Sequence, residues 1–216
     1  MTAVLLVVGD AGAPTAGDLF LQSVLEDDLS YTVTLRSDDT ADSVVGFDGV
    51  LIAESCSSAT LGAKYDTAAV SVVTHEPGNV DMLRLSTSIS FGDTSHTQIT
   101  WLDTAHPIAD GPFGTLSGTD TILSAASIIS WINNSDIPSG VTLVADLVSG
   151  GGTNITCLAC ETGAVLASGT APAKRCFMWP KEAASALLTG VGLQAVQNCY
   201  YWAFEPTPQV IAWVTA

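Results

Sequence analysis

The chain is poor in positive charge. Of its 216 residues only 6 are Lys or Arg, against 22 Asp or Glu, and the formal net charge at pH 7 is −16. Nucleic-acid binding needs Lys and Arg side chains clustered on phosphates, and anionic membrane surfaces attract the same side chains. Six scattered cations therefore exclude both kinds of partner, and the excess of carboxylates predicts a soluble, self-repelling surface.

Long hydrophobic runs are also missing. No apolar stretch approaches the roughly 18 residues that indicate a transmembrane helix, so no membrane span is expected. The chain begins "MTAVLLVVGD", without the basic residues that precede the apolar part of a signal peptide. We therefore expect no signal peptide, and a location in the cytoplasm or within a virion or another large assembly.

Cysteine patterns typical of disulfide or metal sites are absent. The five cysteines are an odd number, which argues against a disulfide framework. Cys157 and Cys160 have the CxxC spacing of a zinc site, but on a strand their side chains point to opposite faces and cannot bind one ion. The loop "GDAGAPTAGD" (9–18) has neither the GxGxxG motif nor the Lys of a nucleotide-binding loop. We expect no metal and no cofactor.

The first third of the chain alternates between strand and helix patterns. The apolar run "AVLLVV" (3–8) predicts a buried strand, and apolar residues then recur at helical spacing over 19–25. Further strands are predicted at 31–37, 47–55 and 68–76. This order is typical of a parallel sheet with right-handed crossovers.

The pattern changes between residue 86 and about residue 180, where short strands are separated by Gly, Pro, Asn and Asp. Strands are expected at 87–91, 97–102, 121–132, 141–148, 154–160, 164–169 and 174–180. Thr162-Gly163 predicts the turn of a hairpin between two of them. These strands should extend the sheet, mostly antiparallel, or form a small second sheet.

Helix patterns return at the C-terminus. The segment "KEAASALL" (181–188) is rich in helix formers, an amphipathic helix is predicted over 188–205, and "QVIAWVT" (209–215) predicts a last strand. The length fits one domain. We therefore expect a single domain over 1–216, with a parallel βα core (1–85), a strand-rich extension (86–180) and a C-terminal helix and strand (181–216).

Six segments carry a family resemblance through their order along the chain. They are "FDGVLIAESCSSATLGAKY", "AVSVVTHEPGNVDMLRLS", "HPIADGPFG", "TCLACETGAVLASG", "KRCFMWP" and "LLTGVGLQAVQNCYYWAFEP". Together they resemble the class I glutamine amidotransferase-like domains of the ThuA-like kind, over most of the chain. The resemblance implies an α/β fold of flavodoxin type. Its central sheet should be mainly parallel with helices on both faces, extended here by the antiparallel strands of the middle region.

The resemblance also implies where a site should lie. In catalytic amidotransferases a nucleophilic Cys follows a strand in a tight turn, and the corresponding turn here reads "THEPG" (74–78), without Cys. ThuA-like members can have a His near this point, so His75 is the residue carried over. The His and Glu expected near the C-terminal end are missing, since the other histidines are His96 and His106. The resemblance thus implies a domain that lacks the catalytic Cys and does not hydrolyse glutamine.

Four residues around this turn are candidates for catalysis. His75 and Glu76 could act as acid and base or hold a metal. Alternatively, His75 could hydrogen-bond the neighbouring loop while Glu76 and Pro77 start the next helix, because adjacent strand residues point to opposite faces. Cys56, with Glu54 and His75, could form a set of Cys-protease type, or it could be a small packing residue.

Three functions remain open. The first, which we favour, is a non-catalytic structural or interaction module with protein partners or a homo-oligomeric state, for example a virion accessory or decoration protein. The second is a hydrolase-type enzyme that uses His75 and Glu76 with Cys56 or a metal. The third is a small-molecule or carbohydrate-binding module, because the crevice of such a fold is a natural pocket.

Overall fold

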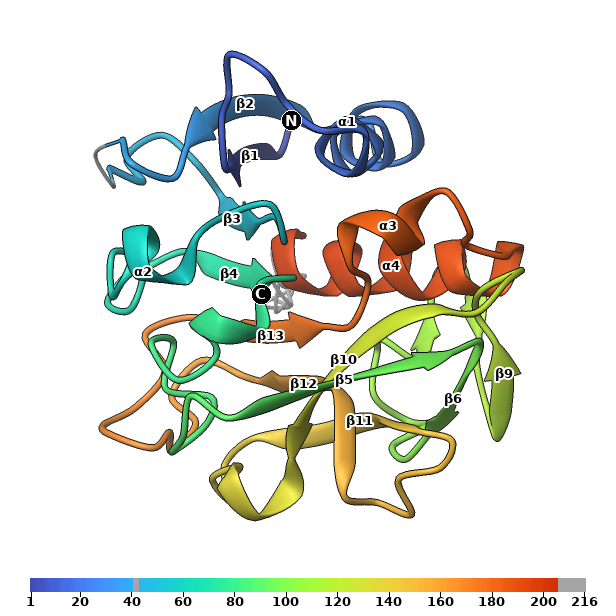
Figure 1. The fold of residues 1–216 in the computed structure, drawn as a ribbon. Coiled ribbons are helices and arrows are strands. Elements are labelled where there is room, and N and C mark those ends of the chain that lie inside the picture. Colours follow the sequence, from blue (N-terminus) through green and yellow to red (C-terminus); the bar gives the residue numbers. More distant parts are fainter. Residues whose placement is uncertain (41–42, 206–216) are drawn as a thin grey trace, which may run out of the picture.

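One large mixed sheet organises the molecule (Figure 1). The computed structural model describes residues 1–40 and 43–205. Eleven strands belong to the sheet, in the order β2-β1-β3-β4-β13-β12-β11-β6-β9, and β10 and β5 branch off from β12. The strand expected at 209–215 lies outside the described residues.

The parallel part of the sheet contains five strands. They are β1 (Ala3–Val8), β2 (Thr32–Ser37), β3 (Gly49–Ile52), β4 (Ser71–Thr74) and β13 (Arg175–Met178). All four pairs between neighbours in this part are parallel. The order β2-β1-β3-β4-β13 is that of a flavodoxin-type sheet, with β13 in the place of the fifth strand. The strand expected at 174–180 therefore belongs to the parallel half of the sheet through its pairing with β4, and not to the antiparallel extension. The remaining strands of the extension are inserted between β4 and β13.

The rest of the sheet is antiparallel. Its strands are β5 (Phe91–His96), β6 (Gln98–Trp101), β9 (Thr119–Thr121), β10 (Ser127–Asn133), β11 (Thr142–Leu147) and β12 (Asn154–Cys160). A separate small hairpin joins β7 (Asp110–Gly111) and β8 (Gly114–Thr115). The sheet as a whole is therefore mixed, and parallel pairing is limited to one half of it.

Two expected strands in the extension have different bounds. The strand predicted at 87–91 begins only at Phe91, because Ser86 and Ser88 accept the amides of Ser88 and Ser90 with their side chains; such local bonds compete with a ladder. The strand predicted at 121–132 is split between β9 and β10, since the Ser124 amide bonds instead to the carbonyl of Leu187.

The predicted hairpin at Thr162-Gly163 is wrong. Gly163 does adopt a turn conformation with φ +84°, but no strand follows over 164–169. The strand after β12 that pairs with it is β13, across the long loop 161–174. The sequence predicted the turn at Gly163 correctly, but the strand that pairs with β12 lies further along the chain.

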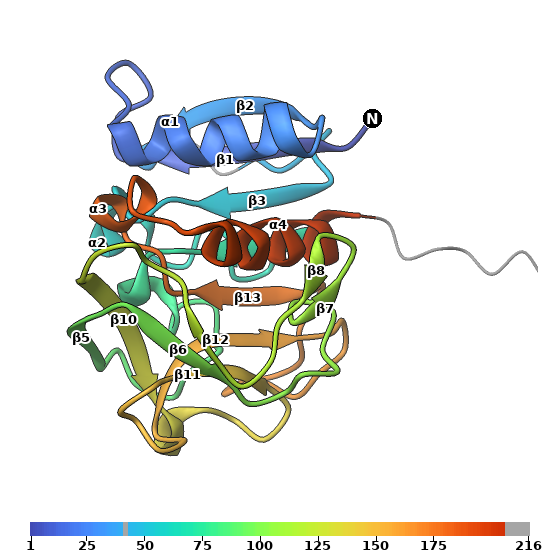
Figure 2. The same cartoon turned by 90° about the vertical axis from the view of Figure 1, so that its right-hand side faces the viewer.

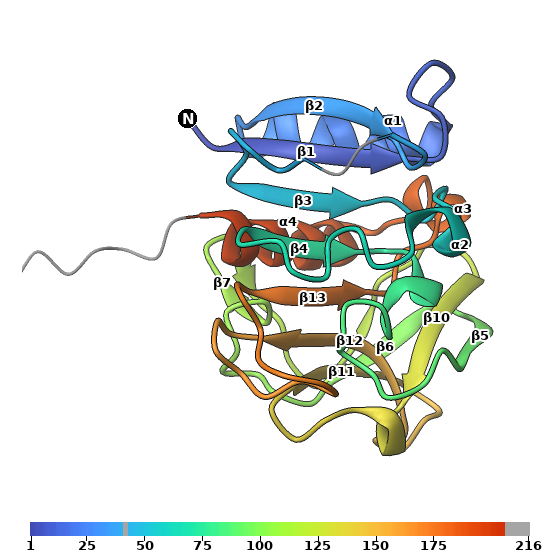
Figure 3. The same cartoon turned by 90° about the vertical axis from the view of Figure 1, so that its left-hand side faces the viewer.

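Helices cover the two faces of the sheet unevenly. One face carries α1 (Ala16–Ser23) with its π-helical continuation Val24–Asp28, α3 (Glu182–Ser185) and α4 (Gly190–Phe204) (Figure 2). On the other face the described chain has α2 (Ser58–Leu61) and a 3-10 turn at Pro77–Asn79, among loops (Figure 3). A further 3-10 turn, Asn134–Asp136, follows β10.

The helix expected at 181–188 is shorter than predicted. It ends at Ser185, because the residues that follow bond to the segment after β9. The Thr189 amide donates to the carbonyl of Ile122, and Leu188 forms a bridge with Leu123. Thr189 then caps α4 by accepting the amide of Gly192.

Two hydrophobic cores lie on the two faces of the sheet. Along β1, Val4 and Leu6 contribute to the core under α1 and α4, whereas Leu5 and Val7 contribute to the core on the other face. This explains the continuous apolar run of β1, because a strand covered on both faces has no solvent-exposed side. No helix in residues 1–40 and 43–205 combines the length and apolarity that crossing a membrane requires.

Candidate functional site

The carboxyl ends of β1, β3, β4 and β13 meet at one edge of the sheet, together with α3 and the start of α1 (Figure 2). In open α/β sheets this edge is where ligands bind. The four candidate residues from the sequence, Glu54, Cys56, His75 and Glu76, all follow β3 or β4 directly. The structure shows which of them come together.

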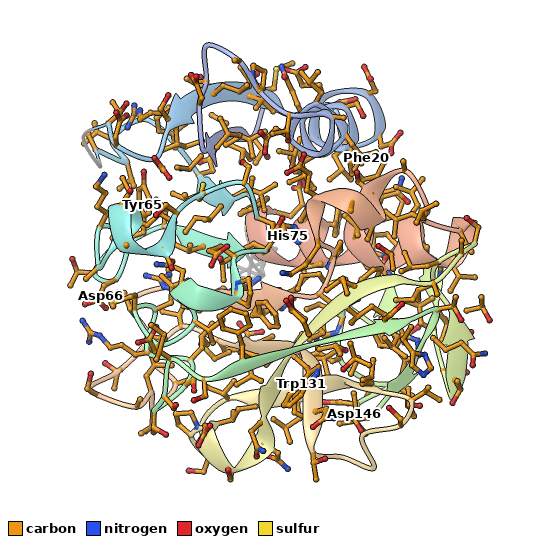
Figure 4. The ribbon with its side chains drawn as sticks, in the orientation of Figure 1. Phe20, Tyr65, Asp66, His75, Trp131 and Asp146 are labelled. Carbon is orange, nitrogen blue, oxygen red and sulfur yellow. The ribbon has the colours of Figure 1, made fainter. Side chains whose placement is uncertain are left out.

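His75 is a core residue. Its side chain lies in the interior of the molecule (Figure 4), and the residue is 1% exposed. Nδ1 is 3.1 Å from the carbonyl oxygen of Met178, and Nε2 is 2.6 Å from the hydroxyl of Tyr200 in α4. Because a carbonyl only accepts, Nδ1–H donates to Met178 and Nε2 accepts from Tyr200. Both ring nitrogens are therefore already engaged.

The surroundings of His75 keep its ring neutral. Burial lowers the pKa of His75 from 6.5 to about 4, although the backbone hydrogen bonds to Met178 and Pro180 oppose the shift. Charging a ring without access to water is costly. His75 thus has the environment of a structural histidine.

Glu76 caps the start of a helical turn, which was the structural alternative to a catalytic role. Its Oε1 accepts the Gly78 amide at 2.9 Å, and Pro77 occupies the first position of the 3-10 turn. The pKa of Glu76 rises to about 7, mainly through burial; the Gly78 amide lowers it, and the nearby Glu54 raises it further. No hydrogen bond between described residues joins Glu76 to His75.

Cys56 is separated from His75 by the sheet. It packs in the core on the face opposite α4, is 5% exposed, and its Sγ–H donates to the carbonyl of Val7 at 3.3 Å. Burial, followed by the charges of Asp38 and Asp18, raises the pKa of this thiol far above its ordinary value. A buried thiol of this kind is inert as a nucleophile, so the structure does not bring Cys56 and His75 together.

The other cysteines are buried as well. Cys176 Sγ and Cys199 Sγ are 3.5 Å apart, and Cys157 Sγ is 3.7 Å from Met178 Sδ. Cys160 packs in the opposite core, which confirms that Cys157 and Cys160 point to different faces. Among the described residues, no group of three His, Cys, Asp or Glu side chains is arranged to hold a metal ion.

Lys181 joins the charged groups at this edge. Its Nζ is 3.3 Å from Glu54 Oε1 and 3.0 Å from Asp93 Oδ2 in β5, and Ser130 donates to the other oxygen of Asp93 at 2.7 Å. Burial alone would lower the pKa of Lys181, but the bond to Asp93 and the charge of Glu54 outweigh it and hold the pKa above its ordinary value. Lys181 was not identified as a candidate site residue from the sequence. Two features could have pointed to it: Lys and Arg are rare in this chain, and Lys181 follows the buried strand β13.

The crevice between β1 and β3 is closed by hydrogen bonds of the protein itself. Ser55 Oγ donates to Asp18 Oδ1 at 2.7 Å and accepts the Gly9 amide at 3.1 Å. A Cβ atom at Gly9 would lie 2.6 Å from the carbonyl oxygen of Ser55. Sheets of this type that bind nucleotides hold the ligand in this crevice. Here Ser55 and the buried Asp18 occupy it.

The accessible space at this edge lies next to the Lys181 ion pairs. An open groove of about 540 Å³ is bounded by α3, the start of α1, the end of β3 and the start of β10. Its lining residues are Ala16, Gly17, Glu54, Ile128, Lys181, Glu182, Ala183, Ser185 and Ala186. Of the four candidates from the sequence, Glu54 lines this groove.

Comparisons with known proteins support the fold. No protein-family model and no curated protein matches the sequence. A solved structure from Parabacteroides merdae, described as a ThuA-like protein, is similar with a TM-score of 0.56 and 10% sequence identity, over 97% of this chain and 93% of that one. A likeness at this identity concerns the fold alone, and the chain has a ThuA-like α/β fold.

Proposed function

We propose that the chain is a non-catalytic structural or interaction module on an amidotransferase-like scaffold. The carrying observation is the state of His75, whose two nitrogens are bonded to Met178 and Tyr200 inside the core. A general base must reach the proton that it removes. An imidazole that is 1% exposed and already paired has a packing role instead.

The partners in this proposal are other proteins, including copies of the chain itself. A virion accessory or decoration protein is the concrete form that the composition favours, because such a protein stays soluble alone and acts by attaching to an assembly. The net charge of −16 keeps free molecules apart. The groove beside Lys181 offers a surface for attachment.

The experiment compares the native particle size with that of the isolated chain. We expect the native protein to travel in an assembly far larger than its own 22.2 kDa, with a contact area above roughly 1,000 Å². His75→Gln should leave the assembly in place when the variant is folded. A native monomer whose hydrolase activity disappears in folded His75→Gln would overturn the proposal.

A small-molecule or carbohydrate-binding module is the second candidate, favoured by the same groove. A volume of about 540 Å³ accommodates a small ligand, and Lys181, Glu54 and Ser185 supply polar groups. A panel of mono- and disaccharides tests this function by thermal shift, because a ligand that binds only the folded state raises the melting temperature. A rise in melting temperature with a sugar, lost in Ala186→Trp, supports the binding function. An unchanged melting temperature with every sugar of the panel contradicts it.

A further inference from the structure

The groove at the carboxyl edge has walls of small apolar residues. Ala16 and Gly17 at the start of α1 line it, together with Ala183 and Ala186 of the α3 region and Ile128 of β10. Ile128 is 38% exposed, although it is a large aliphatic residue. Apolar side chains of a bound chain would therefore find contact area along these walls.

Negative charge dominates the interior of the groove. Glu54 and Glu182 line it, with Lys181 as the only cation among the lining residues. Both carboxylates that pair with Lys181, those of Glu54 and Asp93, lie at or next to the groove. Glu76 lies close enough for Glu54, Lys181 and Asp93 to act on its charge, but its pKa is raised to about 7, so it is only partly ionised at neutral pH. The carboxylates of Glu54, Asp93 and Glu182 against the one ammonium of Lys181 leave a net negative field.

The walls are fixed before any partner binds. α1 and α3 approach closely at Gly17, where a Cβ atom would lie 2.9 Å from the Cα of Glu182. The Glu182 amide also donates to Glu54 Oε2 at 3.3 Å, which ties the start of α3 to the end of β3. A preorganised groove lowers the ordering cost of binding a partner.

We propose that this groove docks a basic, amphipathic segment of a partner protein. Apolar side chains of the segment lie against Ile128 and the alanines, and its Lys or Arg side chains lie beside Glu54 and Glu182. Charge complementarity selects this occupant, because the groove and the whole chain are negative and a basic partner is steered towards both. The inference rests on the proposed interaction function and names the partner chemistry and the surface.

The first test separates the groove from the overall charge. The probe is a fluorescein-labelled peptide of alternating Lys and Leu, followed by fluorescence anisotropy at low salt. Glu54→Gln with Glu182→Gln should weaken binding about tenfold, as expected for two partly exposed ion pairs. The matched control, Glu26→Gln with Asp27→Asn, removes the same charge from the exposed far end of the α1 segment and should change the affinity less than twofold.

The second test leaves the charge unchanged. Ala186 is exposed in the groove, so Ala186→Trp fills it without burying the new ring in the core. The peptide should lose most of its affinity for this variant and keep it for Ala167→Trp, a substitution at an exposed residue outside the groove lining. The inference would be overturned if the groove variant (Glu54→Gln with Glu182→Gln) and the control variant (Glu26→Gln with Asp27→Asn) lost the same peptide affinity, or if Ala186→Trp kept full affinity. Either result would indicate binding by net charge alone.

The native assembly distinguishes this inference from the broader function. Ala186→Trp should release the chain from its native assembly while its melting temperature stays within a few degrees of wild type. If Ala186→Trp remains fully assembled, the groove is not the docking site, although the interaction function stands. A native monomer with hydrolase activity would instead remove the proposed function itself.

Discussion

At the scale of single residues, the sequence predicted where His75 lies along its strand. It did not predict which residues surround the side chain of His75. The strand pattern placed His75 at the carboxyl end of β4. Which face it points to, and what covers that face, depends on α4, whose Tyr200 lies 125 residues further along the chain. Local patterns carry no information on contacts of this range, so they could not separate a catalytic from a packed histidine.

Removing the hydroxyl of Tyr200 should destabilise the fold without changing the shape of the core. Tyr200→Phe leaves Nε2 of the buried His75 without its donor, and an unsatisfied buried polar group costs about 1–3 kcal/mol. Urea unfolding should show a lower midpoint with an unchanged slope. Tyr201→Phe on the exposed side of α4 is the matched control; equal loss in both variants would speak against the His75–Tyr200 bond.

Glu76 should make stability depend on pH. Its pKa in the folded protein, about 7, lies above the ordinary 4.5, so the folded state holds the proton more tightly than the unfolded chain does. Its contribution is present below about pH 4.5 and is lost as the pH rises through about 7. Glu76→Gln keeps an oxygen for the Gly78 amide and should gain stability relative to wild type at pH 8 but not at pH 4.5. A difference that is independent of pH would contradict this environment.

At the scale of elements, the buried parallel strands were the most predictable part. β1 and β3 are continuous apolar runs, which short sequence windows reveal. Pairing in the other half was not predictable in the same way. β13 inserts beside β4 across about a hundred residues, and β12 has β10, β11 and β13 as partners. These pairings join strands that are far apart in the sequence, so no short sequence window indicates them.

The β5–β10 pair depends on a glycine under an aromatic ring. Gly92 lies opposite Trp131, and a Cβ atom at Gly92 would overlap the indole ring. Gly92→Ala should displace the ring and destabilise the protein by about 1–3 kcal/mol, as overpacking does. Thermal unfolding followed by tryptophan fluorescence measures this. Gly190→Ala, at a helical position with no atom within 4 Å of the new methyl, is the control and should not destabilise.

At the scale of the whole molecule, both cores are sealed by an acidic, cation-poor surface. The sequence placed the candidate residues at or directly after the ends of the strands predicted at 47–55 and 68–76, and the structure brings them to the carboxyl edge of the sheet. It could not locate the groove or the role of Lys181, because both arise where α1, α3, β3 and β10 converge.

The sealed interior should be visible in thiol chemistry. All five cysteines are buried and unpaired by disulfides, and burial raises the pKa of Cys56, Cys160, Cys176 and Cys199. Ellman's reagent should therefore label less than one thiol per native chain within minutes, and all five in urea. Rapid labelling of one native thiol would show an opening that the structure does not have.

The central claim is that His75 is a sealed, neutral core residue. Nitrogen-15 NMR of its imidazole, recorded between pH 8 and pH 4, tests this claim most directly. The structure predicts a neutral ring protonated at Nδ1 over most of this range, because the pKa of His75 is lowered to about 4 by burial. A ring that titrates near its ordinary 6.5 with exchange to solvent would contradict the account and return His75 to the list of catalytic candidates.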